Sequence, residues 1–266
     1  MLITSAQNSK IKLVNRLRGK RSRQQEARFV IDYERDLRRA LRQTYRVDFI
    51  LHCPEVAPLP DFGEVEAHQV SFALLKRASY RENPDGMIAV MRSKPAKGLS
   101  ELRAADIDQA LVLVALQVPG NIGALLRTAD AAGIDAVILV DVALDLYNPN
   151  VIRSSTGACF RDNVYQFSSD EALTFLKREA FHIAAADVAG ERSLYELDFR
   201  AKSAIVLGAE DRGLPRDWVE AADDVLRVPM DGTVSDSLNV SVCGALILYE
   251  LYRQTSRDLR FTSQKG

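Results

Sequence analysis

The pattern of apolar and polar residues changes near residue 100, which predicts two parts of the chain. Upstream, short apolar segments such as Arg28–Ile31 and Met87–Met91 alternate with helical patterns, as in a small α/β domain. Downstream, uninterrupted apolar runs alternate with segments of helix length, which is typical of a mainly parallel sheet covered on both faces. The strands expected there are Ala110–Gln117, Ala136–Val140, Asn163–Phe167, Phe181–Ala186, Ser203–Leu207 and Val225–Val228.

A charged stretch separates these two parts. Residues 92–108 carry several charges together with Pro95 and Gly98, a composition typical of a linker. We therefore expect a first domain over residues 1–98, a linker over 99–109 and a second domain over 110–266. The expected helices are Ser9–Leu17, Asp36–Gln43, Ser71–Ala78, Ile122–Ala132, Pro149–Ser155, Asp170–Glu179, Pro215–Ala221 and Ser237–Tyr252.

Composition limits the class of protein. With 266 residues, 47% of them hydrophobic, the chain can bury a substantial core. Its three cysteines, Cys53, Cys159 and Cys243, are far apart and odd in number, so they predict neither a disulfide framework nor a zinc site, and we expect no metal. No signal-peptide pattern is present, and no apolar run approaches the roughly 18 residues of a membrane span. A cytoplasmic location is expected.

Charge is distributed unevenly along the chain. The net charge of -1 argues against a general nucleic-acid binder. Residues 1–46, however, hold thirteen basic and four acidic side chains, a local charge of +9, and the remaining residues carry -10. This asymmetry indicates a basic segment that binds phosphate groups. The ordinary alternative is that these basic side chains form a solvated helix face. The basic residues expected to contact phosphate are Lys10, Lys12, Arg18, Lys20, Arg21 and Arg23.

Three turns rich in glycine and polar residues follow predicted strands, at Pro119–Ala129, Leu207–Pro215 and Val228–Asn239. Ligands of open α/β sheets bind at the carboxyl ends of the strands, so these turns are candidate binding loops. Taken singly, each also fits an ordinary capped helix or an exposed loop. A dinucleotide site is a further alternative for the first turn, but the bulky Ile122 stands where that fingerprint needs a glycine.

Together, the three turns resemble the signature motifs of the SpoU (TrmH) family of RNA ribose 2′-O-methyltransferases, in the SPOUT superfamily. The N-terminal part resembles the ribosomal-protein-like substrate-binding domain of many members. The matching residues there are Thr4-Ser5-x-x-Asn8-x-Lys10-Ile11-Lys12, Arg28-Phe29-Val30 and Asp85-Gly86-Met87-Ile88-Ala89-Val90. The three motifs, which cover about residues 110–253, are Asn121-x-Gly123-x-x-x-Arg127-Thr128-Ala129, Gly208-Ala209-Glu210-x-x-Gly213-Leu214, and Val228-Pro229-Met230-x-Gly232 with Ser237-Leu238-Asn239-Val240-Ser241.

The sequence departs from the family pattern at two places. Ser235 is one residue more than most members have between the glycine of the third motif and Ser-Leu-Asn. Asp32-Tyr33 stand where a Glu-Gly pair commonly follows the Phe-x-x strand. The first departure affects the loop expected to curl round the cofactor, and the second affects substrate handling.

The resemblance implies a fold and a cofactor. The fold is a C-terminal α/β trefoil-knot domain with a mainly parallel sheet, preceded by a smaller α/β RNA-binding domain. The protein would act as a homodimer, with the apolar helix Ser237–Tyr252 in the interface. S-adenosylmethionine would be held in the knotted loops by Leu207, Gly208, Val228, Met230, Ser237 and Leu238.

The resemblance also implies methyl transfer to a ribose 2′-hydroxyl of structured RNA, with large-subunit ribosomal RNA favoured over tRNA. Arg127 is the catalytic arginine by position, and it would bind the adjoining phosphate and orient the hydroxyl, because a guanidinium is a poor base. Asn121 and Asn239 would hold this network, with Ser237 beside it, Glu210 pairing with Arg127 or the substrate, and Arg153 contacting RNA. A non-catalytic RNA-binding or ribosome-assembly factor with the same fold is the alternative.

Overall fold

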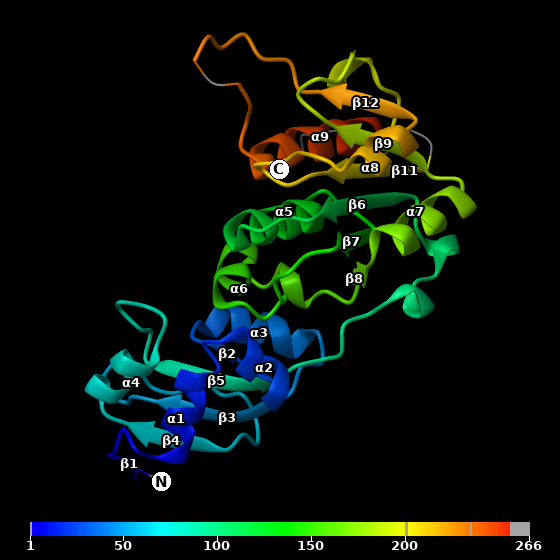
Figure 1. Cartoon of the computed structure of the whole chain (residues 1–266). Helices are drawn as coiled ribbons and strands as arrows, with labels where there is room; N and C mark the ends of the chain where they lie inside the picture. The colour runs from blue at the N-terminus through cyan, green and yellow to red at the C-terminus, as the bar shows by residue number, and fades with distance from the viewer. Residues whose placement is uncertain (1, 200–201, 235, 256–266) are drawn as a thin grey trace, which may run out of the picture. The chain divides into compact units, whose positions relative to one another are not determined.

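The computed structural model describes residues 2–199, 202–234 and 236–255, which form two compact units (Figure 1). The first unit comprises Met1–Pro95 and Leu144–Asp162, and the second comprises Ala96–Ala143 and Asn163–Gly266. In the described part of the chain, no helix combines the length and apolar character that crossing a membrane requires. Each unit has its own sheet and its own core.

The first unit is built on a five-stranded mixed sheet in the order β1-β4-β3-β5-β2. Strand β5 is central to the core because five successive apolar side chains, from Met87 to Met91, are buried. It pairs antiparallel with β2 and β3, whereas β4 pairs parallel with β1 and β3. The elements are β1 (Leu2–Ile3), α1 (Ser9–Arg16), α2 (Lys20–Glu26), β2 (Arg28–Ile31), α3 (Glu34–Arg42), β3 (Val47–His52), β4 (Ala67–Val70), α4 (Phe72–Ala78) and β5 (Met87–Arg92).

The second unit is built on a seven-stranded parallel sheet in the order β10-β12-β9-β11-β6-β7-β8. Strands β7 and β11 are buried along their whole length, as parallel strands covered on both faces must be. The expected α/β fold with a mainly parallel sheet is therefore confirmed. The strands are β6 (Gln109–Val114), β7 (Ala136–Val140), β8 (Val164–Phe167), β9 (His182–Ala186), β10 (Arg192–Ser193), β11 (Ser203–Leu207) and β12 (Asp224–Arg227).

Helices of the second unit connect these strands, and two of them pack together. Helix α9 contacts both α5 and β11 (Figure 1). The buried indole of Trp218 on α8 donates a hydrogen bond to Ser169 Oγ at the start of α7, at 3.1 Å. The helices are α5 (Pro119–Ala131), α7 (Ser169–Arg178), α8 (Arg216–Ala221) and α9 (Val240–Thr255), with 3₁₀ turns η1 (Leu99–Glu101), η2 (Ala104–Asp106) and η4 (Leu194–Glu196).

The segment Leu144–Asp162 belongs to the first unit, although the sequence places it within the second predicted domain. It contains α6 (Pro149–Ser155) and η3 (Ala158–Phe160). The Arg23 guanidinium makes a two-point contact with Asp145, Nη2 to Oδ2 at 2.7 Å and Nε to Oδ1 at 3.1 Å. The Phe29 and Tyr147 rings stack with centroids 4.4 Å apart. These contacts join two distant stretches of sequence, while the domain boundaries at 98 and 110 stay a prediction.

Replacing Asp145 by alanine should destabilise the first unit, because the Arg23 side chain is only 3% exposed and would lose its carboxylate partner. Breaking a buried ion pair costs about 3–5 kcal/mol, so we expect Asp145→Ala to lower the unfolding free energy by about 3 kcal/mol in urea titrations followed by circular dichroism. The control Glu220→Ala removes the partner of the exposed Arg216 and should cost under about 1 kcal/mol. Equal losses in both variants would contradict a structural role for the buried pair.

Candidate active site

Side chains from the three turns meet at the carboxyl edge of the parallel sheet. Asn121 lies in the first turn of α5, which follows β6, Glu210 follows β11, and Asn239 precedes α9. Asn121 Nδ2 donates to Glu210 Oε1 at 2.5 Å, and Asn239 Nδ2 donates to Asn121 Oδ1 at 3.3 Å. The convergence expected from the sequence is therefore present for these three residues.

The turn after β11 is held tightly by its own backbone. Ala209 and Gly213 exchange two backbone hydrogen bonds, of 3.2 and 2.9 Å, which close the loop that carries Glu210. A Cβ at Gly208 would lie 2.5 Å from the carbonyl group of Gly213, closer than real Cβ atoms approach backbone. Gly213 itself has a φ of +66°, in the left-handed region that favours glycine. Leu207, just before the turn, is buried in β11.

Helix α9 packs closely on the sheet because Gly244 has no side chain. A Cβ there would collide with the Leu125 side chain of α5 and would lie 2.7 Å from Leu207 Cδ1 of β11. The helix therefore lies directly over the strand that leads into the Glu210 loop. This close packing sets the position from which Asn239 reaches Asn121.

The predicted start of this helix is wrong by three residues. Helix α9 begins at Val240, and Asn239 Oδ1 accepts hydrogen bonds from the backbone N of Ser241 at 2.9 Å and from its Oγ at 2.6 Å. The Asn239 side chain thus satisfies a backbone N–H at the helix start, as capping asparagines do. Ser237 and Leu238 lie in the exposed loop before the helix.

The other expected cofactor residues lie in the same loop region. Val228 directly follows β12 and is half-buried, whereas Met230 is exposed. Gly232 has open space around it, since no heavy atom lies within 4 Å of a Cβ built there. Ser235, the additional residue of this loop, lies outside the described residues.

Arg127 lies on the exposed side of α5, six residues after Asn121. Within the described ranges, no hydrogen bond or ion pair engages its guanidinium, and the Glu210 carboxylate accepts from Asn121 and not from Arg127. The expected pairing of Glu210 with Arg127 is therefore absent here.

A fourth loop, Asp187–Gly190 after β9, joins the site and was not found from the sequence. Asp187 N donates to Leu226 O at 2.9 Å, and an Asp187 carboxylate oxygen lies 3.7 Å from where a Gly213 Cβ would be. Gly190 passes so close to β12 that a Cβ would lie 2.6 Å from the Leu226 carbonyl carbon. The available signal was a polar turn ending in glycine after a predicted strand, as in the other three loops.

Among the basic residues expected to contact RNA, Arg23, Arg18 and Lys10 have structural partners within the first unit. Besides binding Asp145, buried Arg23 donates to the carbonyls of Leu17 and Arg18, at 2.9 and 2.7 Å. The Arg18 guanidinium donates to the carbonyls of Arg77, Ala78 and Ser79 at the end of α4, at 2.9, 3.2 and 2.9 Å. Because Arg23 is buried and has these partners, it does not belong to the expected RNA surface. Arg18 caps the end of α4.

Lys10 is the third of these residues. Its Nζ lies 3.2 Å from Glu66 and 4.2 Å from the centre of the Phe49 ring, and the Glu66 carboxyl has a lowered pKa because Lys10 hydrogen-bonds to it. Lys12, Lys20 and Arg21 are exposed, and so is Arg153 on α6. In the part of the chain that the structure describes, no cluster of three or more His, Cys, Asp or Glu side chains could hold a metal ion.

Family models match both parts of the chain. The model of the SpoU rRNA Methylase family matches residues 108–249, and that of the MRM3-like substrate binding domain matches residues 8–89. The first match covers more than half of the chain and includes the three turns. The chain therefore belongs to the SpoU rRNA methylase family.

Individual relatives agree with this assignment. The chain is 30% identical over 250 residues to the 23S rRNA (guanosine(2553)-2′-O)-methyltransferase RlmP of Bacillus subtilis, covering 94% of this chain and 98% of the relative. A crystal structure of an RNA 2′-O ribose methyltransferase shares 39% identity and a TM-score of 0.84, covering 96% of this chain and 99% of that one. The SpoU methyltransferase AviRb of Streptomyces viridochromogenes in complex with AdoMet shares 26% identity and a TM-score of 0.80, covering 93% and 98%.

These matches confirm the class expected from the three motifs, an RNA ribose 2′-O-methyltransferase that uses S-adenosylmethionine. The residues fit such a cofactor, because the turn of Gly208 and Gly213 presents closely packed backbone, without intervening side chains, at the carboxyl edge of the sheet where ligands of α/β sheets bind. Gly123 accordingly belongs to a motif of this family and not to a dinucleotide fingerprint.

Replacing Gly208 by alanine tests this closely packed turn. The new Cβ must push apart the loop that Ala209 and Gly213 close. Such overpacking costs about 1–3 kcal/mol, so S-adenosylmethionine should bind about tenfold more weakly in isothermal titration calorimetry. The control Gly120→Ala meets no atom within 4 Å and should bind as the wild type does. Unchanged affinity in Gly208→Ala would place the cofactor elsewhere.

Proposed function

We propose that this protein transfers a methyl group from S-adenosylmethionine to a ribose 2′-hydroxyl of large-subunit ribosomal RNA. The observation that carries the proposal is the convergence of Asn121, Glu210 and Asn239 on the helix whose exposed face bears Arg127. The names of the relatives, which include 23S rRNA methyltransferases, and the match to a substrate-binding domain support ribosomal RNA as the substrate.

The loops at the carboxyl edge of the sheet would hold the cofactor. Backbone around Gly208, together with Val228 and Leu238, would line its site, and Leu207, Met230 and Ser237 would complete it. When bound, the cofactor supplies a methyl group on a sulfonium sulfur for in-line displacement by the ribose oxygen. The rigid turn of Ala209 and Gly213 keeps Glu210 and the backbone beside it in place for this reaction.

Arg127 would position the nucleophile. A ribose hydroxyl reacts slowly at neutral pH unless it is oriented and its proton has an acceptor as the new bond forms. The Arg127 guanidinium stays protonated, so it would bind the phosphate next to the target ribose and hold the hydroxyl through that contact. Asn121 and Asn239 would fix the surrounding network, with Ser237 beside them, and the exposed Glu210 carboxylate would face the substrate.

The first unit would bind the RNA. Its exposed basic side chains include Lys12, Lys20 and Arg21 on one stretch and Arg153 on α6. Arg18 and Lys10 are exposed in part but already have partners, so we propose a smaller contribution from them. Phosphate contacts of this kind weaken as salt rises, because bound counterions are released.

The homodimer and the trefoil knot are part of the proposal. Val242, Leu246 and Tyr249 follow one another at helical spacing on α9 and are 48%, 41% and 51% exposed, an unusual apolar face for a surface helix. With Tyr195 they line a groove of about 440 Å³, which supports an interface between two copies. Helix α9 also returns from β12 to pack on β11 and α5, which supports a threaded path.

A cytoplasmic location is also proposed. Cys53 and Cys159 are buried and Cys243 is partly buried, and all three are free thiols. Burial raises the pKa of the Cys159 thiol to about 12, so it stays protonated and unreactive. Free buried cysteines are typical of proteins kept in a reducing compartment.

Arg127→Ala should lower methyl transfer by about a hundredfold or more, because a positioned charge is lost from the reaction site. Transfer of labelled methyl groups to purified ribosomal RNA and to tRNA measures the rate and the substrate class together. S-adenosylmethionine should bind the Arg127→Ala variant as tightly as it binds the wild type. The control is Arg178→Ala, which replaces an exposed arginine paired with its neighbour Glu179, and it should change neither methyl transfer nor cofactor binding.

Three results would contradict parts of this proposal. An equal loss of cofactor binding in Arg127→Ala would assign the arginine to the cofactor site. Methylation of tRNA alone would replace the proposed substrate. RNA binding by the wild type without any methyl transfer would identify a non-catalytic RNA-binding factor.

Leu246→Asp should convert a dimer into monomers, since a carboxylate in the centre of an apolar interface loses its hydration without gaining a partner. Light scattering coupled to size-exclusion chromatography measures the mass directly. Val56→Asp, at an exposed apolar position of the first unit, is the matched control and should stay dimeric. A monomeric wild type, or a dimeric Leu246→Asp, would remove α9 from the interface.

A further inference from the structure

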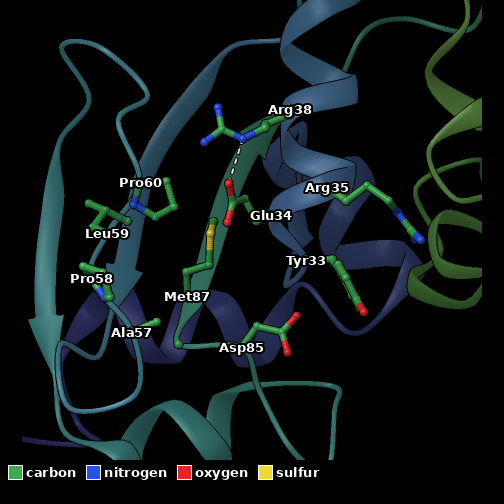
Figure 2. A pocket seen from close by; sticks show the side chains of 11 residues that line it. Tyr33, Glu34, Arg35, Arg38, Ala57, Pro58, Leu59, Pro60, Asp85 and Met87 are labelled. Carbon is green, nitrogen blue, oxygen red and sulfur yellow. Dashed lines mark hydrogen bonds and ion pairs between the residues drawn. The ribbon is translucent and has the colours of Figure 1, made fainter.

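A cavity in the first unit lies outside the methyl-transfer site. It measures about 530 Å³ and lies between the start of α3, the loop after β3 and the turn into β5 (Figure 2). This volume is within the range of about 300–1,000 Å³ found for sites that bind small organic groups. The residues that matter for its chemistry are Glu34, Arg38, Pro58, Leu59, Asp85 and Met87.

One wall of the cavity is apolar. Figure 2 shows Pro58, Leu59 and Pro60 on their loop, facing Met87 and Glu34 across the opening. Such a wall offers no hydrogen bonds to a free ion, but it packs well against a flat apolar ring. The wall therefore favours a planar organic group with polar edges.

The opposite wall carries the Arg38 guanidinium, which the Glu34 carboxylate holds in place. Arg38 Nε lies 2.7 Å from Glu34 Oε1, and its guanidinium lies over the Phe62 ring at 5.0 Å. Asp85, at the end of the turn, pairs with Arg81 at 2.5 Å. Guanidinium planes and aromatic rings are the surfaces on which unpaired RNA bases stack, and carboxylates accept hydrogen bonds from base N–H groups.

Tyr33 connects this cavity with a second hollow on the same unit. The second hollow is lined by Asp32, Tyr33, Tyr80, Pro149 and Arg153. Asp32 fixes Tyr80 there, since its Oδ2 accepts from Ser79 Oγ at 3.0 Å and from Tyr80 N at 3.2 Å. The exposed Arg153 places a cation in this second hollow.

We propose that the cavity between Leu59 and Arg38 takes one unpaired base of the RNA substrate. This inference rests on the proposed function, since it assumes that RNA is the ligand of the first unit. The base lies against Pro58, Leu59 and Met87, the Arg38 guanidinium stacks on it, and Glu34 and Asp85 accept hydrogen bonds from its edge. Arg153 binds a neighbouring phosphate across Tyr33.

Two variants test the cavity, each with a matched control. Leu59→Asp places a charge in the apolar wall, and Val56→Asp places the same charge on the same loop but outside the cavity. Arg38→Ala removes the guanidinium and its exposed pair with Glu34, and Arg216→Ala removes an equivalent exposed pair with Glu220, four residues along α8. The probe is a labelled single-stranded RNA of mixed sequence, compared with the same RNA annealed to its complement.

The single strand should bind the wild type more tightly than the duplex does. Because stacking one base is worth about 1–3 kcal/mol, Leu59→Asp and Arg38→Ala should each weaken single-strand binding about tenfold, with duplex binding and both controls unchanged. If Leu59→Asp lowers the melting temperature of the protein, its weaker binding can come from unfolding. The Arg38→Ala variant, which changes an exposed side chain, then tests the proposal. Equal affinities of Arg38→Ala and Arg216→Ala for the single strand would overturn the proposal.

The binding assay separates this inference from the proposed function. It uses the full chain without a methyl donor, so it reports on the cavity whether or not methyl transfer occurs. Methyl transfer to ribosomal RNA with no effect of Arg38→Ala on binding would refute the base site alone. Selective single-strand binding that Arg38→Ala weakens, without any methyl transfer, would keep the base site and refute the enzymatic proposal.

Discussion

The Asn121 side chain joins two loops that lie 89 and 118 residues away in the sequence. An amide suits this place because it donates and accepts at the same time, here to Glu210 and from Asn239. Each such hydrogen bond adds only about 0.5–1.5 kcal/mol in an exposed position, too little to place the loops. Their places are set by the buried strands β6 and β11, which run side by side with Leu113 opposite Leu207.

Close packing of the backbone fixes the positions of the loops relative to these strands. At Gly208, Gly190 and Gly244 a single added carbon would meet another part of the chain at less than 3.0 Å. Gly208 lets the turn after β11 close on itself, Gly190 lets the loop after β9 pass against β12, and Gly244 lets α9 approach α5 and β11. The backbone at the base of the site is therefore closely packed, while Arg127 and Glu210, the groups proposed to face the substrate, remain exposed.

Much of the second unit could be predicted because its strands are short uninterrupted apolar runs. The bounds of β7 and β11 agree residue for residue with the expected ones. Elements without such a pattern were not found: helix α2 is wholly polar, and β4, with the sequence AHQV, has no apolar run. The start of α9 was placed too early because Ser237 and Asn239 are equally good capping residues, and only the fold decides between them.

Charge in the sequence could not distinguish arginines that bind RNA from arginines that hold the fold. Arg23 and Arg18 lie in the same basic segment as Arg21, yet one is buried against Asp145 and the other caps α4. The partner Asp145 lies 122 residues away, so no local pattern could indicate the pair. The same contact brings the segment of Arg153 into the first unit. The proposed RNA surface therefore combines two stretches of sequence, and part of the +9 charge of the first 46 residues stabilises the fold.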